Sequence, residues 1–217
     1  MSDYNSLTAS ELGDMIGQGE IDPVELTEHF LSRIEASLIG KKIYSTVTSQ
    51  LALEQAKDAK KRAISGRRLS SLDGVPISWK DLFDIEGYPC EAGSELLAGR
   101  LANQNCEVYN LAEAQGLICL GKTHMSELAF SGLGLNPVRE TPPCVNYPES
   151  GPGGSSSGAA TSVSFGLAAA GIGSDTGGSV RIPAAWNDLV GFKTTAGKLS
   201  LDGIVPLCSR FDTVGPL

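Results

Sequence analysis

Along the first 66 residues, hydrophobic side chains recur at the three- and four-residue spacing of amphipathic helices. These positions are Leu12, Met15, Ile16, Leu26, Phe30 and Ile34. Thr8 opens the first stretch and has a glutamate three positions later, which is the capping-box pattern of a helix start. Asp22 and Pro23 open the second stretch, with an acid at the N-cap and proline at the first helical position. An alanine-rich run over residues 49–63 predicts a third helix that ends near Gly66. Residues 1–66 are therefore predicted to be mainly helical.

From residue 67 to residue 217 the pattern changes to short apolar runs separated by helix-like segments. Residues 75–77 and 116–120 have the length and composition of buried strands. Residues 108–114 and 125–130 alternate with them as helix-like segments. The Pro- and Asn-rich stretch after residue 136 predicts a long loop. Strands that alternate with helices predict an α/β domain for this part of the chain.

The composition is that of an ordinary globular protein, with 41% hydrophobic and 19% charged residues. The 17 basic and 25 acidic residues give a formal net charge of −8, which argues against a direct nucleic-acid partner because phosphate binding needs clustered Lys and Arg. The N-terminus has no signal-peptide pattern, and no apolar stretch is long enough for a membrane span. Five scattered cysteines predict reduced thiols in a cytoplasmic protein, and the two histidines give poor support to a metal site.

The most informative segment covers residues 151–183, which contain nine Gly and seven Ser but only two charged residues, Asp175 and Arg181. A flexible linker can share this glycine and serine content. A linker would not enclose the apolar, small-residue run 159–170, which predicts a tightly packed helix. Two glycine-rich turns that flank such a helix indicate backbone brought close to a ligand.

Three kinds of chemistry could explain these turns. Phosphate binding fits badly, because the first turn lacks the Lys of a P-loop and Thr176 stands where a dinucleotide fingerprint has Gly or Ala. A nucleophile elbow would centre on Ser156, but that triad needs an acid and then a histidine after the serine, and His29 and His124 both precede it. The third is a serine that is activated by a lysine whose pKa is lowered by burial. Lys80, at the end of an apolar run, is the candidate base. Taken without further context, a lysine at this position is more often a solvated surface residue than a base.

Three segments, in this order, resemble motifs of the amidase signature family of serine amidohydrolases. Residues 75–81 resemble its lysine segment, residues 152–156 its first serine motif and residues 173–183 its core signature. Shorter similarities occur at residues 121–123, 136–137, 191–193 and 212–216. The resemblance spans nearly the whole chain, and it implies a mixed β-sheet covered by α-helices, with the helical segment 1–66 wrapping one side of a catalytic core segment 67–217.

The resemblance also implies a role for each motif residue. Ser179 would be the nucleophile that forms an acyl-enzyme, and Lys80 would be the base. Ser155, which would follow an unusual cis peptide bond, would relay the proton between them. Asp175 and Arg181 would support the loop as a pair. The oxyanion hole would be formed by the backbone N–H groups of Thr176, Gly177, Gly178 and Ser179. The implied reaction is hydrolysis of a small-molecule carboxamide without metal or organic cofactor.

One branch of the family is the A subunit of glutamyl-tRNA amidotransferase, which passes ammonia to partner subunits. Its members usually have Gln after the signature arginine, whereas this chain has Ile182, which favours a free-standing amidase. Ser157 and Thr194 are further departures, from Gly and Pro respectively. Relatives continue well past the segment corresponding to residues 212–217, so we expect the N-terminal part of a single catalytic domain. A truncated binding module without activity is the remaining alternative, and self-association or amidotransferase partner subunits are both compatible with the motifs.

Overall fold

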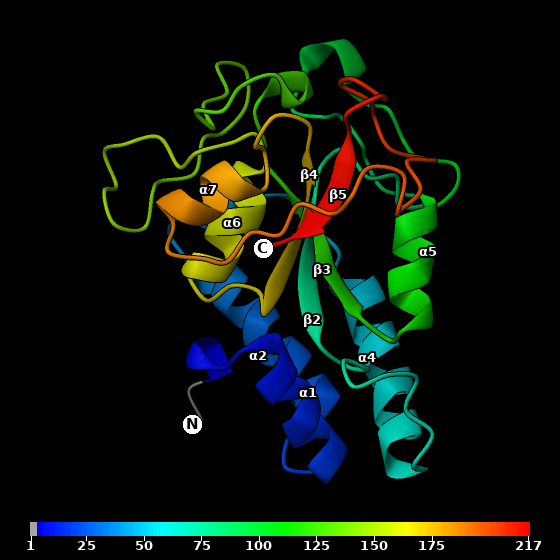
Figure 1. Ribbon diagram of the computed structural model, residues 1–217. Coiled ribbons are helices and arrows are strands. Elements are labelled where there is room, and N and C mark those ends of the chain that lie inside the picture. The colour runs from blue at the N-terminus through cyan, green and yellow to red at the C-terminus, as the bar shows by residue number, and fades with distance from the viewer. Residues whose placement is uncertain (1–3) are drawn as a thin grey trace.

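A five-stranded sheet forms the centre of the computed structural model, which describes residues 4–217 (Figure 1). The strands are β1 (Tyr44–Val47), β2 (Pro76–Lys80), β3 (Ile118–Thr123), β4 (Ala170–Asp175) and β5 (Thr213–Pro216). Their order in the sheet is β1-β3-β2-β4-β5. The three central strands are parallel, and both edge strands are antiparallel to their neighbours. The predicted mixed sheet is confirmed.

Helices and short 3-10 turns surround this sheet. The α-helices are α1 (Ala9–Gln18), α2 (Pro23–Ala36), α3 (Gly40–Ile43), α4 (Ser49–Ile64), α5 (Glu107–Ala114), α6 (Ser157–Ser164) and α7 (Arg181–Trp186). The 3-10 turns are η1 (Tyr4–Ser6), η2 (Glu95–Leu97) and η3 (Glu127–Ala129). Within residues 4–217, no helix has both the length and the hydropathy that crossing a membrane requires.

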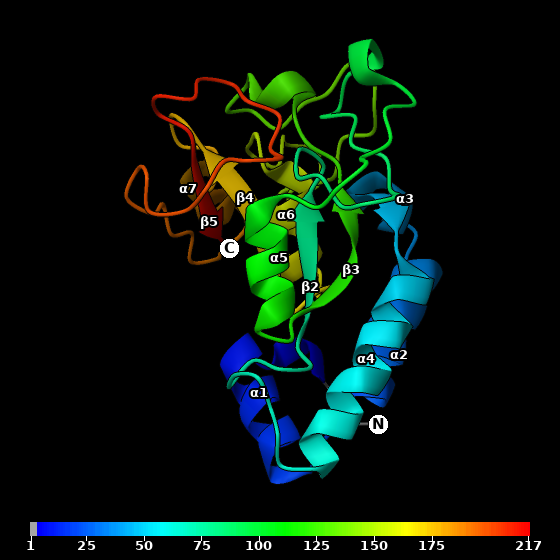
Figure 2. The ribbon, with the colours of Figure 1, turned by 90° about the vertical axis from the view of Figure 1, so that its right-hand side faces the viewer.

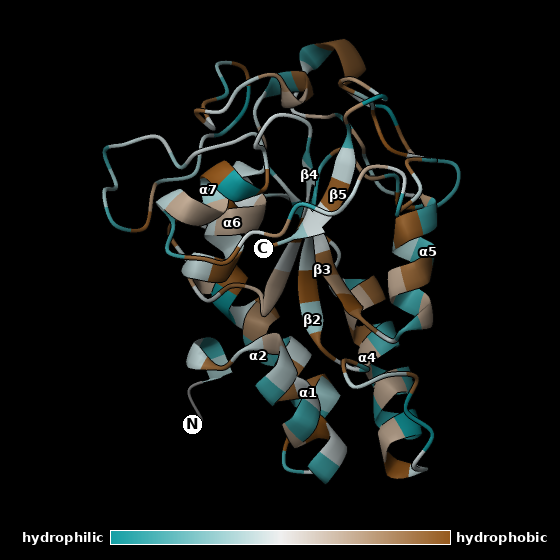
Figure 3. Ribbon diagram, in the orientation of Figure 1, coloured by the Kyte–Doolittle hydropathy of each residue, from teal (hydrophilic) through white to brown (hydrophobic). Residues whose placement is uncertain are grey.

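The side chains of β2 alternate between the two faces of the sheet, as they do in any strand. Trp79 points to one face, where its ring lies 5.3 Å from the ring of Tyr109 in α5. Gln55 of α4 donates a hydrogen bond of 3.0 Å to the Tyr109 hydroxyl, so α4 and α5 lie on the same face. Ser78 points the other way and shares a hydrogen bond of 2.7 Å with Ser162 of α6. In Figure 2, α5 lies in front of the strands and α6 behind them. Figure 3 shows hydrophobic residues along the central strands that these helices cover.

The helices predicted over the first 66 residues are all present. Thr8 caps α1 with both hydrogen bonds of the capping box, and Asp22 accepts a hydrogen bond from the N–H of Val24 at the start of α2. The third helix, α4, ends at Ile64. The same segment also contributes β1, which the helical pattern did not predict. Strands from both sides of residue 66 therefore belong to one sheet.

The run 159–170, predicted as one helix, is divided between two elements. Helix α6 ends at Ser164, and Ala170 already belongs to β4. Gly166 reverses the chain between them with a φ of 65°, and the N–H of Leu167 closes the turn on the carbonyl of Ser162 at 2.7 Å. The prediction was wrong on the length of the helix. The small side chains let α6 pack closely on β4, with which it makes direct contact.

The segment 125–130, predicted as helix-like, forms only the 3-10 turn η3. Leu128 and Ala129 have φ values of 47° and 60°, which a continuous right-handed helix does not permit. The N–H of Leu128 instead donates to the carbonyl of Ala92 at 2.9 Å. A tertiary hydrogen bond thus replaces the helical one at this point.

A buried ion pair joins the carboxyl ends of β2 and β3. The Nζ of Lys122 lies 2.8 Å from a carboxylate oxygen of Asp81, and the exposed fractions of the two side chains are 0% and 6%. Lys122 also donates to the carbonyl of Pro89 at 2.9 Å, and the second oxygen of Asp81 accepts from the N–H of Glu91 at 3.2 Å. Burial raises the pKa of Asp81, and the Lys122 charge opposes that rise. The pair therefore ties the loop around residues 89–91 to the sheet.

We predict that Lys122→Met lowers the free energy of unfolding by about 3–5 kcal/mol, because it leaves a buried carboxylate without its counter-charge. The double variant Lys122→Met/Asp81→Leu should recover most of that loss, since it removes both charges. Lys61→Met, which removes the exposed ion pair with Asp58, is the matched control and should stay close to the wild type. Urea denaturation of the wild type and the three variants measures the free energy of unfolding. Equal destabilisation by the single and the double variant would contradict the prediction.

Candidate active site

Two neighbouring strands of the central parallel set end in a charged residue. Lys80 is the last residue of β2, and Asp175 is the last residue of β4. Ligands of open α/β sheets bind beyond the carboxyl ends of such strands, where the connecting loops converge. The long loops that follow β2, β3 and β4 gather at this end of the sheet (Figure 1).

Lys80 is completely buried, and its amino group faces two hydroxyl groups. Its Nζ lies 2.7 Å from the Oγ of Ser155 and 2.8 Å from the Oγ of Ser174. Burial lowers the pKa of Lys80 to about 7, although the charges of Asp175 and Asp212 act in the opposite direction. Near neutral pH, a substantial fraction of this amine is therefore uncharged and can accept a proton from a hydroxyl group.

Ser155 lies in a tight turn that leads into α6. The peptide bond between Gly154 and Ser155 is cis, and the serine side chain is fully buried. The turn is held from one side by two backbone hydrogen bonds: the N–H of Gly154 donates to Gly132 at 2.9 Å, and the carbonyl of Ser155 accepts from Ser126 at 3.2 Å. These bonds keep the Ser155 hydroxyl directed at Lys80.

Ser179 lies in the turn between β4 and α7, with 8% of its surface exposed. Its carbonyl accepts a hydrogen bond of 3.2 Å from the N–H of Ser156. The two serine-bearing turns are therefore joined directly through their backbones. The structure brings Ser155 into contact with Lys80 and places Ser179 on the neighbouring turn.

The carboxylate of Asp175 organises the turn that carries Ser179. It accepts hydrogen bonds from the N–H groups of Gly178 at 2.8 Å and Val180 at 3.1 Å. The Arg181 guanidinium reaches the same carboxylate with Nε and Nη2, both at 3.0 Å. Burial alone would raise the pKa of Asp175, but Arg181 and the backbone donors lower it overall. The expected pair of Asp175 and Arg181 is present as an ion pair.

The four backbone groups proposed for an oxyanion hole have different surroundings. The N–H of Gly178 is engaged by Asp175, which differs from the expectation that all four donate to a substrate. Gly178 has a φ of 133°, and a side chain there would lie 2.7 Å from the Cδ1 of Ile182. At Gly177, which is exposed, a side chain would meet no protein atom within 4 Å. The open side of the turn is thus at Gly177.

Two residues that the motifs did not single out as site residues complete this arrangement. Ser174 is the second partner of Lys80, and it reaches that position because β4 lies beside β2. Asp212 accepts a hydrogen bond from the Thr176 hydroxyl and further bonds from the N–H groups of Leu207 and Cys208. Only the pairing of strands and loops reveals Ser174 and Asp212. Ser156, the centre of the elbow-like motif, donates its hydroxyl to the Ser174 carbonyl at 3.3 Å.

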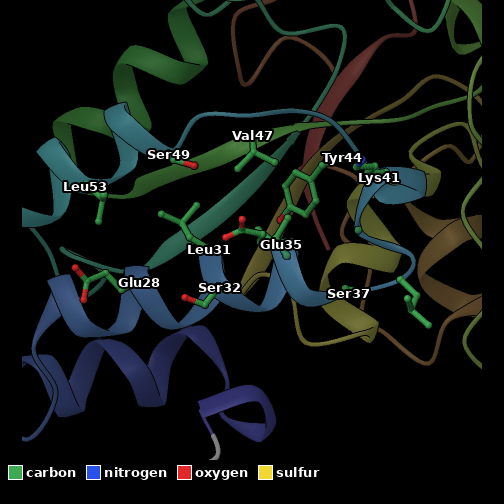
Figure 4. A pocket seen from close by; sticks show the side chains of 13 residues that line it. Glu28, Leu31, Ser32, Glu35, Ser37, Lys41, Tyr44, Val47, Ser49 and Leu53 are labelled. Atoms are coloured by element: carbon green, nitrogen blue, oxygen red, sulfur yellow. The ribbon is translucent and has the colours of Figure 1, made fainter.

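Two cavities have volumes in the range that holds a small molecule. One of about 620 Å³ is lined by Glu127, Leu128, Phe130, Ser131, Leu135, Pro137, Pro206 and Leu207. Another, of about 730 Å³, lies among α2, α3, β1 and α4 (Figure 4). Neither cavity is lined by a predicted site residue. Among the described residues, no group of three or more His, Cys, Asp or Glu side chains is placed to bind a metal ion.

Comparison with known protein families and sequences identifies relatives for almost the whole chain. The sequence model of the family described as Amidase matches residues 25–217. The A subunit of glutamyl-tRNA(Gln) amidotransferase from Anaeromyxobacter dehalogenans (strain 2CP-C) is 41% identical over 209 residues, which are 95% of this chain and 42% of that protein. Its counterpart from Lactococcus lactis subsp. cremoris (strain SK11) is 38% identical over 214 residues, 99% of this chain and 44% of that protein. The chain spans less than half the length of these relatives.

Solved structures show the same similarity in three dimensions. The peptide amidase of Stenotrophomonas maltophilia superposes with a TM-score of 0.90 at 30% identity, covering 99% of this chain and 45% of that chain. A fatty acid amide hydrolase superposes with a TM-score of 0.89 at 25% identity, covering 98% of this chain and 38% of that chain.

Lys80 gives a pH-dependent prediction. We expect the rate of labelling by a fluorophosphonate to rise with pH and to level off above a midpoint of about 7, because only the neutral amine can accept the hydroxyl proton. Lys80→Met should slow labelling by about 10²–10⁴-fold and remove the midpoint. Lys61→Met serves as the control for loss of a lysine. A midpoint that persists in Lys80→Met would assign the titration to another group.

Proposed function

The chain belongs to the amidase signature family, and on that basis we propose that the whole protein hydrolyses the C–N bond of a small-molecule carboxamide through an acyl-enzyme on Ser179. The observation that carries the proposal is the contact of 2.7 Å between the Ser155 hydroxyl and the fully buried amine of Lys80. A buried amine with a pKa near 7 beside a hydroxyl group is the arrangement that a serine nucleophile needs in the absence of a histidine. The proposed setting is the cytoplasm, without metal or organic cofactor.

In the first step, neutral Lys80 takes the proton of the Ser155 hydroxyl while Ser155 takes the proton of the Ser179 hydroxyl. The Oγ of Ser179 forms a bond to the carboxamide carbon, and the carbonyl oxygen becomes an oxyanion. Lys80 is then an ammonium ion that remains hydrogen-bonded to Ser155 and Ser174. The hydrogen bond from the N–H of Ser156 to the carbonyl of Ser179 supports this relay, because it keeps the two serine turns together.

The oxyanion would be stabilised by the N–H groups of Thr176, Gly177 and Ser179. Removing one such donor typically costs about 3 kcal/mol of transition-state stabilisation. The N–H of Gly178 is committed to Asp175 in this structure, so we assign that glycine to the shape of the turn. The open space at Gly177 supports placement of the substrate carbonyl on that side.

In the second step, the tetrahedral carbon reforms its carbonyl and the C–N bond breaks. The proton held by Lys80 passes through Ser155 to the leaving nitrogen, so the amine departs neutral and Lys80 is again a base. A water molecule then attacks the acyl-enzyme with the same proton relay. The products are a carboxylic acid and ammonia or an amine, and Ser179 regains its proton.

The second candidate is the ammonia-supplying component of a glutamyl-tRNA amidotransferase, which would work together with partner subunits. It is favoured by relatives such as the Anaeromyxobacter and Lactococcus proteins, which are 38–41% identical to this chain. Ile182, where such proteins usually have Gln, favours a free-standing amidase instead. Both candidates use the same serine chemistry, and glutamine hydrolysis that rises on addition of partner subunits would support the second. A binding module without activity is the outcome if the serines prove unreactive.

Serine substitutions in the whole protein test the proposal. Ser179→Ala should abolish fluorophosphonate labelling and lower amide hydrolysis by at least about 10⁴-fold, because it removes the nucleophile. Ser155→Ala should lower both rates strongly, since it breaks the relay to Lys80. Ser157→Ala is the matched control from the same turn, because its hydroxyl donates a long hydrogen bond of 3.4 Å to the His124 carbonyl and does not contact Lys80. Labelling that survives in Ser179→Ala would reject the assignment of the nucleophile.

A further inference from the structure

A third, much smaller cavity lies beside Ser174, the second hydroxyl partner of Lys80. Its volume is about 10 Å³. A cavity needs about 10–15 Å³ and two to four polar partners to hold one water molecule. The polar residues of its lining are Ser174, Thr176, Asp212 and Thr213, and the other lining residues are apolar. This cavity therefore has the size and the polar groups of a site for a single water molecule.

The hydrogen bond between Lys80 and Ser174 needs one particular direction if Lys80 is to act as a base. A neutral amine has one lone pair, and the proposed relay requires that lone pair at the Ser155 hydroxyl. Lys80 must then donate an N–H to the Oγ of Ser174, which lies 2.8 Å from its Nζ. If Ser174 donated to Nζ instead, its hydrogen would occupy the lone pair and block proton transfer from Ser155. The hydrogen of the Ser174 hydroxyl therefore needs a different acceptor.

Asp212 provides a negative charge on the same cavity. Among the described residues, Lys80 is the one protein group that is hydrogen-bonded to the Oγ of Ser174. An ionised carboxylate only accepts hydrogen bonds, and it has about four acceptor sites. The Asp212 carboxylate accepts three donors, which are the Thr176 hydroxyl and two backbone N–H groups. It can accept one more, and the cavity separates it from Ser174 by the space of one water molecule.

We propose that this cavity binds one water molecule, which accepts the Ser174 hydroxyl and donates to the Asp212 carboxylate. The hydroxyls of Thr176 and Thr213 face the same cavity and donate their own hydrogens to Asp212 and to the Asp175 carbonyl. Either of them can therefore accept the second hydrogen of the water.

The inference rests on the proposed function and specifies how its base is prepared. The carboxylate orients the water, the water orients the Ser174 hydroxyl, and Ser174 then stays an acceptor toward Lys80. The lone pair of Lys80 remains available to Ser155. Asp212 is thus a positioning residue, which acts on the base through the water and Ser174.

The loop before β5 keeps the cavity apart from bulk solvent. The N–H of Val205 donates to the carbonyl of Leu82 at 2.9 Å, and both residues line the cavity. Leu82 is 2% exposed, and Asp212 is 9% exposed. Hydrogen bonds are stronger in such surroundings than in water, and an unsatisfied polar group is costly there. The surroundings therefore favour a water molecule that stays bound.

A crystal structure of the whole wild-type protein tests the site directly. We expect an ordered water molecule within hydrogen-bonding distance of the Ser174 Oγ and of an Asp212 carboxylate oxygen. A map that shows other buried waters but none in this cavity would overturn the inference. This test does not depend on whether any variant folds.

Asp212→Asn tests the carboxylate with a side chain of the same size. Its amide can donate to the water, so that the Ser174 hydroxyl can reverse and donate to Lys80. We expect the maximal rate of fluorophosphonate labelling at high pH to fall by at least about tenfold. The pH midpoint should move below that of the wild type, because the Asp212 charge raises the pKa of Lys80. Asp202→Asn, an exposed residue of the same loop, is the matched control and should change neither quantity.

Ser174→Ala tests whether Asp212 acts through Ser174. This variant has no hydroxyl that can reverse, so adding Asp212→Asn to it should lower the maximal rate by less than about threefold. An equal loss in the presence and in the absence of the Ser174 hydroxyl would show that Asp212 acts by another route, and it would overturn the inference.

The outcomes separate this inference from the proposed function. A wild type that the fluorophosphonate does not label contradicts both. A wild type that is labelled with a midpoint of about 7, but that has no water in the cavity or no coupling between Ser174 and Asp212, overturns only the water site. The serine chemistry would then stand without it.

Discussion

The contact between Lys80 and Ser155 is the constraint on which the rest of the site depends. A charged ammonium group without solvent is costly unless hydrogen bonds or counter-charges compensate it. Lys80 has two hydroxyl partners, and its environment lowers its pKa to about 7. The sheet therefore holds an amine that can be neutral under ordinary conditions. Both hydroxyl groups come from segments more than 70 residues away in sequence. Burial, which lowers the pKa of Lys80, likewise requires the assembled sheet.

Two carboxylates serve this site without contacting the proposed reacting atoms. Asp175 accepts backbone N–H groups of the turn that bears Ser179, and Arg181 compensates its charge. Asp212 binds the Thr176 hydroxyl and the N–H groups of the loop before β5. Both also raise the pKa of Lys80, against the effect of burial. The two carboxylates that hold the turns thus limit how far burial lowers the pKa of Lys80.

Asp81, which forms the buried ion pair with Lys122, also connects the sheet to the loop around Leu128 through its backbone. Asp81 follows Lys80 directly, and its backbone carbonyl accepts the N–H of Ala92 at 2.9 Å. Ala92 in turn accepts the N–H of Leu128, which lines the cavity of about 620 Å³. Two successive backbone hydrogen bonds therefore lead from the residue next to the proposed base to Leu128. The proposed base and the loop around Leu128 are therefore both held at the carboxyl ends of the strands.

The sequence by itself determined the first helices of the chain and singled out the motif residues. Capping patterns at Thr8 and Asp22 depend on neighbours within a few residues, and the helices they predict are present. Small apolar residues suit both a packed helix and a buried strand, so the composition of residues 159–170 did not show where the helix ends. The pairing of β4 with β2 and β5 decides that Ala170 belongs to a strand. Tertiary structure alone decided that Ser174 and Asp212 belong to the site and that the N–H of Gly178 faces Asp175. The reason is physical: hydrogen bonds between strands and loops join residues whose spacing in the sequence carries no periodic signal.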